Sequence, residues 1–78
     1  MNRALTEALL NQSARIVCEL GNGEIHETLL VDYYPIANDE YDIHVEDLAT
    51  GNSYGITLAN VVQLVLHDGQ MMSRSDLG

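Results

Sequence analysis

The chain has no Lys, no Trp and no Phe, and it has one Cys and one Pro. A single cysteine excludes an intramolecular disulfide, and without Trp or Phe the core must be built from Tyr, Val, Leu and Ile. No stretch approaches the ~20 apolar residues of a membrane span, and the first residues lack the apolar run of a signal peptide. We therefore expect a cytoplasmic protein that does not bind membranes.

Positive charge is the scarcest property of the sequence. Three Arg stand against twelve Asp and Glu, which gives a formal net charge of -9, and no Arg or Lys occurs between Arg15 and Arg74. Because proteins bind phosphate backbones by neutralising them with Lys and Arg, direct nucleic-acid binding is disfavoured. The charge either keeps a small protein in solution or presents a negative surface to a partner.

The 78 residues are enough for one small domain with a thin core. Residues 2–11 are predicted to form a short helix, because four apolar residues fall on one face at helical spacing: Ala4, Leu5, Ala8 and Leu9. Residues 69–78 have no periodicity, which is typical of a flexible tail. We predict one domain over residues 1–68, followed by this tail.

Five segments have the alternation of short strands: residues 14–20, 24–34, 40–47, 53–58 and 61–66. The sequence Gly-Asn-Gly at 21–23 predicts a hairpin turn between the first two. With no second helix for a parallel crossover, the sheet should be antiparallel. The fold class is therefore mainly β, with five short strands that close most economically into a strongly bent, partly open barrel.

The long second strand has an irregular pattern. Four apolar residues are predicted to share one face of this strand, namely Ile25, Leu29, Val31 and Tyr33. Leu30 faces the other way, which suggests a strongly bent strand that serves two parts of a barrel. Tyr33 and Tyr34 must face opposite sides, so that one enters the core. The other stands near Asp32, where an exposed Tyr beside an acid could anchor an interface.

The third strand carries the densest acidic cluster. Tyr41, Ile43 and Val45 are expected on the core side, and the residues between them on a polar side. The predicted protein-binding residues are this polar side with its acidic and aromatic neighbours: Asp32, Tyr34, Asp39, Glu40, Asp42, His44, Glu46 and Asp47.

Catalytic chemistry finds little support in the sequence. Cys18 alternates in phase with Ile16 and is expected in the core. No nucleophile or phosphate-binding motif is present. His26 and His44 would approach each other if their strands pair, which leaves a metal site open as an alternative. Our prediction is that the chain has no catalytic, cofactor-binding or metal-binding residues.

Three stretches together resemble the Sm-like or SH3-like small β-barrel: residues 16–33, 38–47 and 56–65. Within that group the chain is similar to the Rof (YaeO) family, through "ELGNGE" at 19–24, Asp32, "EY" at 40–41 and "ITLANV" at 56–61. That resemblance implies a helix packed on a barrel, and binding to the transcription terminator Rho at its RNA-binding site. The acidic helix of the family is not matched, since Glu7 is the only acid in residues 2–11.

Our leading hypothesis is a non-enzymatic interaction module whose acidic face binds a basic partner that itself binds nucleic acid. The partner would be Rho in a Rof-like regulator, or another enzyme in a phage or mobile-element inhibitor. The alternatives are an Sm-like nucleic-acid-binding module and a structural domain without ligand. A homodimer would cover an exposed edge strand.

Overall fold

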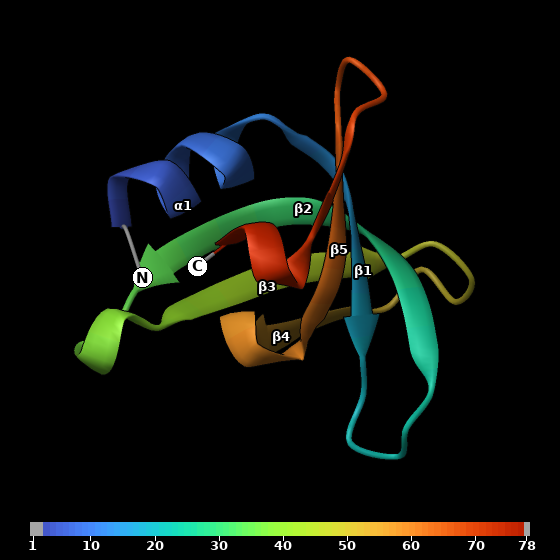
Figure 1. The fold of residues 1–78 in the computed structure, drawn as a ribbon. Coiled ribbons are helices and arrows are strands. Elements are labelled where there is room, and N and C mark those ends of the chain that lie inside the picture. The colour runs from blue at the N-terminus through green and yellow to red at the C-terminus, as the bar shows by residue number, and fades with distance from the viewer. Residues whose placement is uncertain (1–2, 78) are drawn as a thin grey trace.

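The computed structural model describes the backbone of residues 3–77 and the side chains of residues 4–38 and 40–76 (Figure 1). A helix, α1 (Arg3–Asn11), precedes six strands: β1 (Ser13–Glu19), β2 (Ile25–Pro35), β3 (Tyr41–Asp47), β4 (Ser53–Thr57), β5 (Val61–Leu66) and β6 (Met71–Ser73). Three 3-10 turns complete this part of the chain: η1 (Ala37–Asp39), η2 (Leu58–Asn60) and η3 (Arg74–Leu77). The prediction of a mainly β fold with a short N-terminal helix is confirmed.

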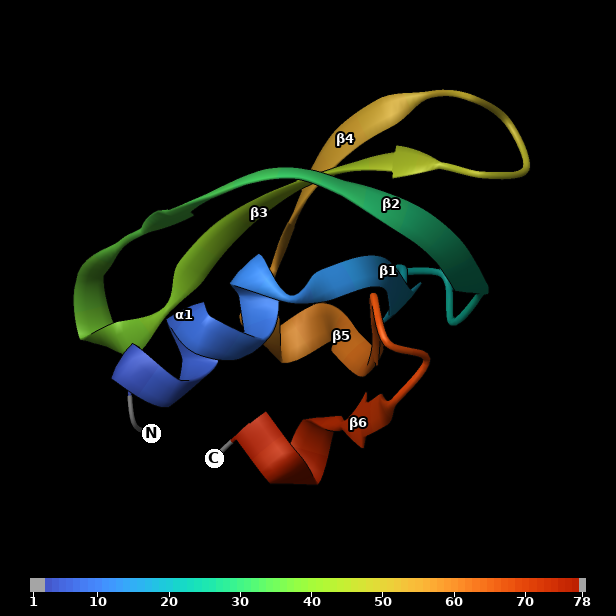
Figure 2. The same ribbon diagram turned by 90° about the horizontal axis from the view of Figure 1, so that it is seen from above.

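All strand pairs are antiparallel, and the sheet order is β4-β3-β2-β1-β5-β6. The sheet is not closed: β4 and β6 form its edges, and it has six strands instead of the five expected. Figure 2 shows the long curve of β2 and β3, with α1 lying beside β1 and β5 beneath it. The strong bend expected of β2 is therefore present.

The hairpin between β1 and β2 turns at Gly21-Asn22-Gly23, as the sequence predicted. The amide of Leu20 donates to the carbonyl of Glu24 at 2.9 Å, and that of Gly23 donates to Leu20 at 2.8 Å. Gly23 has a φ of 84°, a left-handed conformation that glycine adopts without a steric penalty. The two strands then pair regularly, with Cys18 opposite His26.

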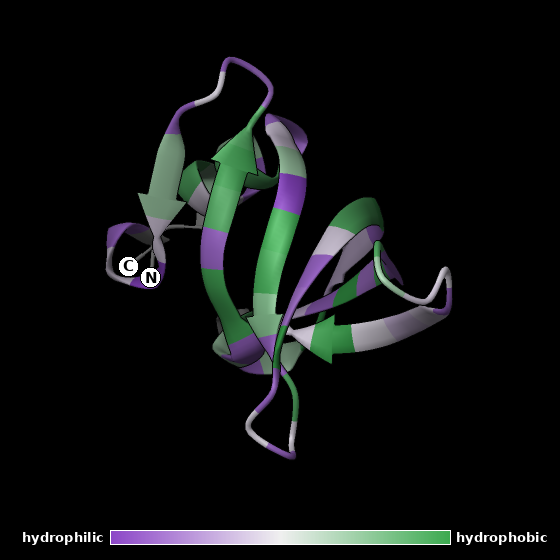
Figure 3. Cartoon of the chain, turned by 90° about the vertical axis from the view of Figure 1, so that its right-hand side faces the viewer, coloured by the Kyte–Doolittle hydropathy of each residue, from purple (hydrophilic) through white to green (hydrophobic). Residues whose placement is uncertain are grey.

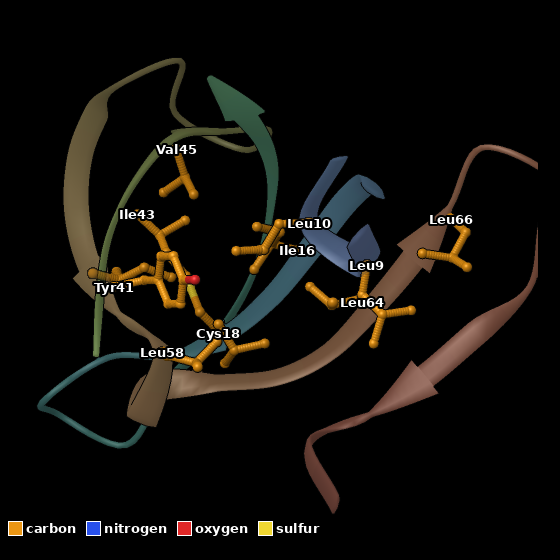
Figure 4. Close-up of a cluster of buried hydrophobic side chains, with 12 residues drawn as sticks. Leu9, Leu10, Ile16, Cys18, Tyr41, Ile43, Val45, Leu58, Leu64 and Leu66 are labelled. Atoms are coloured by element: carbon orange, nitrogen blue, oxygen red, sulfur yellow. The ribbon is translucent and has the colours of Figure 1, made fainter. Parts of the chain in front are cut away.

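The core lies between the curved sheet and α1 (Figure 4), and its buried apolar side chains are Leu9, Leu10, Ile16, Cys18, Tyr41, Ile43, Val45, Ile56, Leu58, Val61, Leu64 and Leu66. The expected alternation of β1 and β3 is confirmed by Ile16, Cys18, Tyr41, Ile43 and Val45. Figure 3 shows the hydrophobic colour concentrated in the strands, while the loop between β5 and β6 is hydrophilic.

The buried face of α1 differs from the prediction. Thr6, Leu9 and Leu10 are buried, whereas Leu5 is 46% exposed. These three residues also have i, i+3, i+4 spacing, and Leu9 belongs to both faces. The helix is joined to β3 by the Tyr41 hydroxyl, which donates to Oε1 of Glu7 at 2.9 Å.

The inner face of β2 also differs from the prediction. Thr28 is buried, and Leu30 and Tyr33 pack against the core, but Ile25, Leu29 and Val31 are exposed. A β-bulge places Tyr33 on the side of Leu30 and away from these exposed residues, since the pairing with β3 shifts register between Leu30 and Asp32.

The segment expected to be a flexible tail holds an additional strand. Within β6, Met71 lies opposite Val65 and Met72 opposite Leu64, and the Met72 side chain packs against the core. Three residues are too few to show a periodicity in the sequence, which explains why β6 was missed.

Exchanging Met72 for Ala should lower the free energy of unfolding by roughly 1 to 2 kcal/mol, because Met72 covers the core only in part. The matched control is Met71→Ala, since Met71 is 63% exposed and its exchange should cost about 0.5 kcal/mol or less. Urea unfolding of both variants measures the difference, and equal values would mean that β6 is not docked in solution.

Candidate functional site

Four of the predicted binding residues meet on the outer face of the β2–β3 hairpin. The Tyr34 hydroxyl donates to Oδ2 of Asp32 at 2.7 Å, and the Tyr34 ring lies edge-on to the ring of His44 with centroids 5.4 Å apart. Nε2 of His44 lies 3.2 Å from Oδ2 of Asp42. We call Asp32, Tyr34, Asp42 and His44 the outer cluster.

The strands bring these residues together by pairing Asp32 with His44 and Tyr34 with Asp42. The hydrogen bond from Tyr34 lowers the pKa of Asp32, with smaller contributions from the Tyr33 amide and the charge of His44. The same hydrogen bond raises the pKa of Tyr34. The outer cluster therefore holds a stabilised carboxylate beside an aromatic side chain at the surface.

The remaining predicted residues of the hairpin lie around this cluster or outside it. Glu46 is exposed, opposite Leu29 on β2 and Ser53 on β4. It is the next outward residue of β3 after His44, so it extends the acidic face along this strand. Glu40 is half-buried, with its Oε2 inside the molecule. The backbone of Asp39 ends η1, and its side chain lies outside the described residues.

Asp47 does not belong to the acidic face, contrary to the prediction. Its side chain is only 2% exposed, because it lies on the same side of β3 as the buried Tyr41, Ile43 and Val45. The strand alternation itself carried this signal, since odd-numbered residues of β3 point inward. The prediction grouped Asp47 with its charged neighbours, although its position in the strand alternation places it on the core side.

The buried Asp47 carboxylate accepts hydrogen bonds from three segments. Oδ1 takes the amides of Ala49 at 2.8 Å and Thr50 at 3.3 Å, in the turn that follows β3. Oδ2 takes the Tyr54 hydroxyl at 2.8 Å and lies 2.6 Å from Nδ1 of His26. Asp47 thus ties the β3–β4 turn to β4 and to the start of β2.

His26 continues the chain of contacts toward solvent. Its Nε2 lies 3.0 Å from Oε2 of Glu24, so the imidazole is held between two carboxylates. We call Glu24, His26, Asp47 and Tyr54 the clamp. Sequence reasoning missed it, because it joins residues from three separate segments of the chain.

The contacts of the clamp shift the protonation equilibria of its members. Hydrogen bonds from Tyr54 and from the Ala49 amide are the main cause that lowers the pKa of Asp47 to about 2. Hydrogen bonds to Glu24 and then to Asp47 raise the pKa of His26 above 6.5. Burial, followed by the bond to Asp47, raises the pKa of Tyr54. Near neutral pH these contacts favour a carboxylate at Asp47 and a neutral Tyr54.

Cys18 lies in the core, as predicted, with no exposed surface. Burial is the main cause that raises the pKa of its thiol, and the charge of Asp47 acts in the same direction. A raised pKa lowers the fraction of thiolate, which is the nucleophilic form.

The two histidines do not form a joint metal site. His44 is opposite Asp32, while His26 lies six residues earlier on β2, opposite Cys18 of β1. Six residues of a strand span about 20 Å. Within the described part of the chain, no group of three or more His, Cys, Asp or Glu is arranged to hold a metal ion.

A shallow depression of about 560 Å³ lies over the clamp, lined by Glu24, Ile25, His26, Glu27, Asp47, Leu48 and Ala49. A carboxylate that orients an imidazole is also the arrangement of a general base. Here both ring nitrogens of His26 are already engaged, one by Asp47 and one by Glu24. The geometry therefore supports a structural connection between the β2 start and the β3–β4 turn.

Among the residues that the structure describes, none of the helices is long and apolar enough to cross a membrane.

Comparisons with known proteins give no relative. No family model, no curated protein and no solved structure matches the chain.

Proposed function

We propose that this protein is an interaction module without enzymatic activity. Its outer cluster, together with Glu46, presents a negative face to a basic partner that binds nucleic acid. An acidic face of this kind steers association with a positive cleft and occupies a site built for phosphates.

The observation that carries the proposal is the concentration of acids around an aromatic side chain. Asp32, Asp42 and Glu46 lie on one hairpin face with the half-exposed Tyr34. Among the side chains described, every close contact between a carboxylate and a cationic group involves a histidine. The nearest arginine by register is Arg15 on β1, which is separated from Glu46 by Leu29.

We further propose that the sheet is a partly open barrel of the SH3-like or Sm-like kind. Supporting this are the order β4-β3-β2-β1-β5, the long bent β2 and the 3-10 turn η2 between β4 and β5. In the Rof-like version of the proposal, the partner is the transcription terminator Rho in the cytoplasm, and binding blocks its RNA site.

The direct test reverses the charge of the face. Asp42→Lys combined with Glu46→Lys should weaken partner binding roughly tenfold or more, because attraction becomes like-charge repulsion. Immobilised protein is incubated with purified Rho, and separately with a bacterial lysate whose retained proteins are identified by mass spectrometry. Retained proteins should be basic, bind nucleic acid and elute at moderate salt.

The matched control is Glu19→Lys combined with Asp68→Lys, which changes the net charge by the same amount at exposed positions outside the hairpin. This control should retain the partner. If both double variants bind equally well, the hairpin face is not the binding site. If only the lysate and not Rho yields the partner, the general proposal stands and its Rof-like version is wrong.

A further inference from the structure

The edge strand β4 is open to pairing. In the described part of the chain, β4 pairs with β3 on one side and has no strand on the other. Its five residues, Ser53–Thr57, include no charge and no Pro, which are the usual protections of an edge against pairing. The other edge, β6, is only three residues long and runs directly into η3.

The outer surface of β4 leaves the acids of β3 accessible from this edge. Its outward positions carry only small side chains, Ser53, Gly55 and Thr57, which are all exposed. They lie opposite the acidic side of β3, with Gly55 facing His44 and Thr57 facing Asp42.

Gly55 has a specific role in this geometry. A Cβ atom at this position would lie 3.3 Å from Oδ1 of Asp42, so the Asp42 carboxylate extends over Gly55 toward the free edge. The other oxygen of Asp42 is 3.2 Å from Nε2 of His44, which fixes the carboxylate there. A hollow of about 270 Å³ adjoins it, lined by Val31, His44, Val45, Ser53, Tyr54 and Gly55.

We propose that an extended, basic segment of the partner pairs with β4 as an additional strand. Its backbone would bond to the free edge, and an Arg or Lys side chain would cross Gly55 to reach Asp42. Neighbouring strands lie about 4.8 Å apart. Such a side chain therefore needs to cross only β4, whose outward side chains are small, to reach Asp42 on β3. Main-chain bonds give affinity in this mode, and side-chain contacts give specificity. The inference rests on the proposed function and names the conformation of the bound segment.

Charge decides between a basic partner and a second copy of this chain. Two copies would each bring a net charge of -9 and place one acidic hairpin face beside the other. A basic segment instead neutralises Asp42 and Glu46 at the edge. Aliphatic stems of Arg and Lys also fill shallow apolar hollows while their charged ends reach outward.

The test adds an eleven-residue peptide of alternating Thr and Arg to the full chain at low salt. Amide NMR spectra of the chain are recorded before and after the addition. We expect shift changes and slowed hydrogen exchange in residues 53–57. A second peptide of the same sequence carries N-methyl groups on two adjacent central residues, which block both edges of a strand. This peptide should lose binding, and an alternating Thr and Glu peptide should not bind.

Two protein variants locate the contact. Asp42→Asn should weaken binding of the Arg peptide about threefold, the range for an exposed charge pair, and Gly55→Val should weaken it by displacing the carboxylate and filling the hollow. Asp68→Asn, in the loop after β5, is the control and should bind unchanged. Equal binding of both variants and the control would overturn the placement at Gly55.

The possible outcomes separate the two proposals. If the methylated peptide binds as well as the unmethylated one, pairing with β4 is refuted, and attraction to the acidic face remains as the mode of binding. If neither Arg peptide binds at low salt, strand addition and the acidic interaction face both fail. If only the unmethylated Arg peptide binds and shifts the amide signals of residues 53–57, the result supports both strand addition and the acidic interaction face.

Discussion

An Asp47→Ala variant should unfold roughly 10 °C or more below the native chain, since unpaired buried groups cost stability and a small domain loses several degrees per kcal/mol. The exchange removes the acceptor of the Tyr54 hydroxyl and of the Ala49 and Thr50 amides. It also removes the partner of Nδ1 of His26. Thermal unfolding followed by circular dichroism measures the effect.

Two further variants show whether the clamp is the cause. Glu46→Ala removes the neighbouring acid, which is exposed, and should leave the midpoint nearly unchanged. Tyr54→Phe removes a single hydrogen bond to Asp47 and should have a smaller effect than Asp47→Ala. If the midpoint of thermal unfolding is the same for Asp47→Ala and Glu46→Ala, the Asp47 carboxylate does not stabilise the fold.

Stability should also depend on pH in two separate windows, set by Asp47 and His26. The folded pKa of Asp47, about 2, lies below its ordinary value of 3.8, so the carboxylate stabilises the fold above pH 3.8. That contribution is lost as the pH falls from 3.8 through 2. The pKa of His26 is raised above 6.5, so its contribution is complete below pH 6.5 and is lost as the pH rises through the folded pKa.

The His26 window is measured by urea unfolding at about pH 5.5 and pH 8.5, for the native chain and for His26→Gln. The native chain should lose more stability than the variant on going to the higher pH. Repulsion among the other acids also changes with pH, but it is common to both chains and cancels in the comparison. A His26→Gln chain with the same pH dependence as the native chain would contradict the assigned contacts to Glu24 and Asp47.

Regular alternation made most of the sheet predictable. β3 follows a strict period of two and β1 follows it around Ile16 and Cys18, and these two residues are buried as expected, together with Tyr41, Ile43 and Val45. The Gly-Asn-Gly turn at 21–23 also has a local cause that the sequence shows directly. The third strand placed Asp42 and His44 on its outer face for the same reason, so half of the outer cluster followed from β3 alone.

Features that depend on tertiary contacts were not predictable in this way. The burial of Asp47 follows from the period of β3, but its partners His26 and Tyr54 come from other strands, and a single sequence does not show which strands meet. Thr6 concealed the buried face of α1, because a hydroxyl side chain does not contribute to an apolar pattern. β6 is held by its pairing with β5, not by a pattern of its own.

The bulge in β2 shifts the phase of the strand by one residue. Before it, Thr28 and Leu30 face the core; after it, Tyr33 does, while Val31 and Asp32 are both exposed. In an uninterrupted strand, Tyr34 and Asp32 would share the side of Leu30. The bulge therefore places Asp32 and Tyr34 on the outer face and Tyr33 on the core side. The composition of the outer face thus depends on one extra residue within β2 as much as on the residues that the face displays.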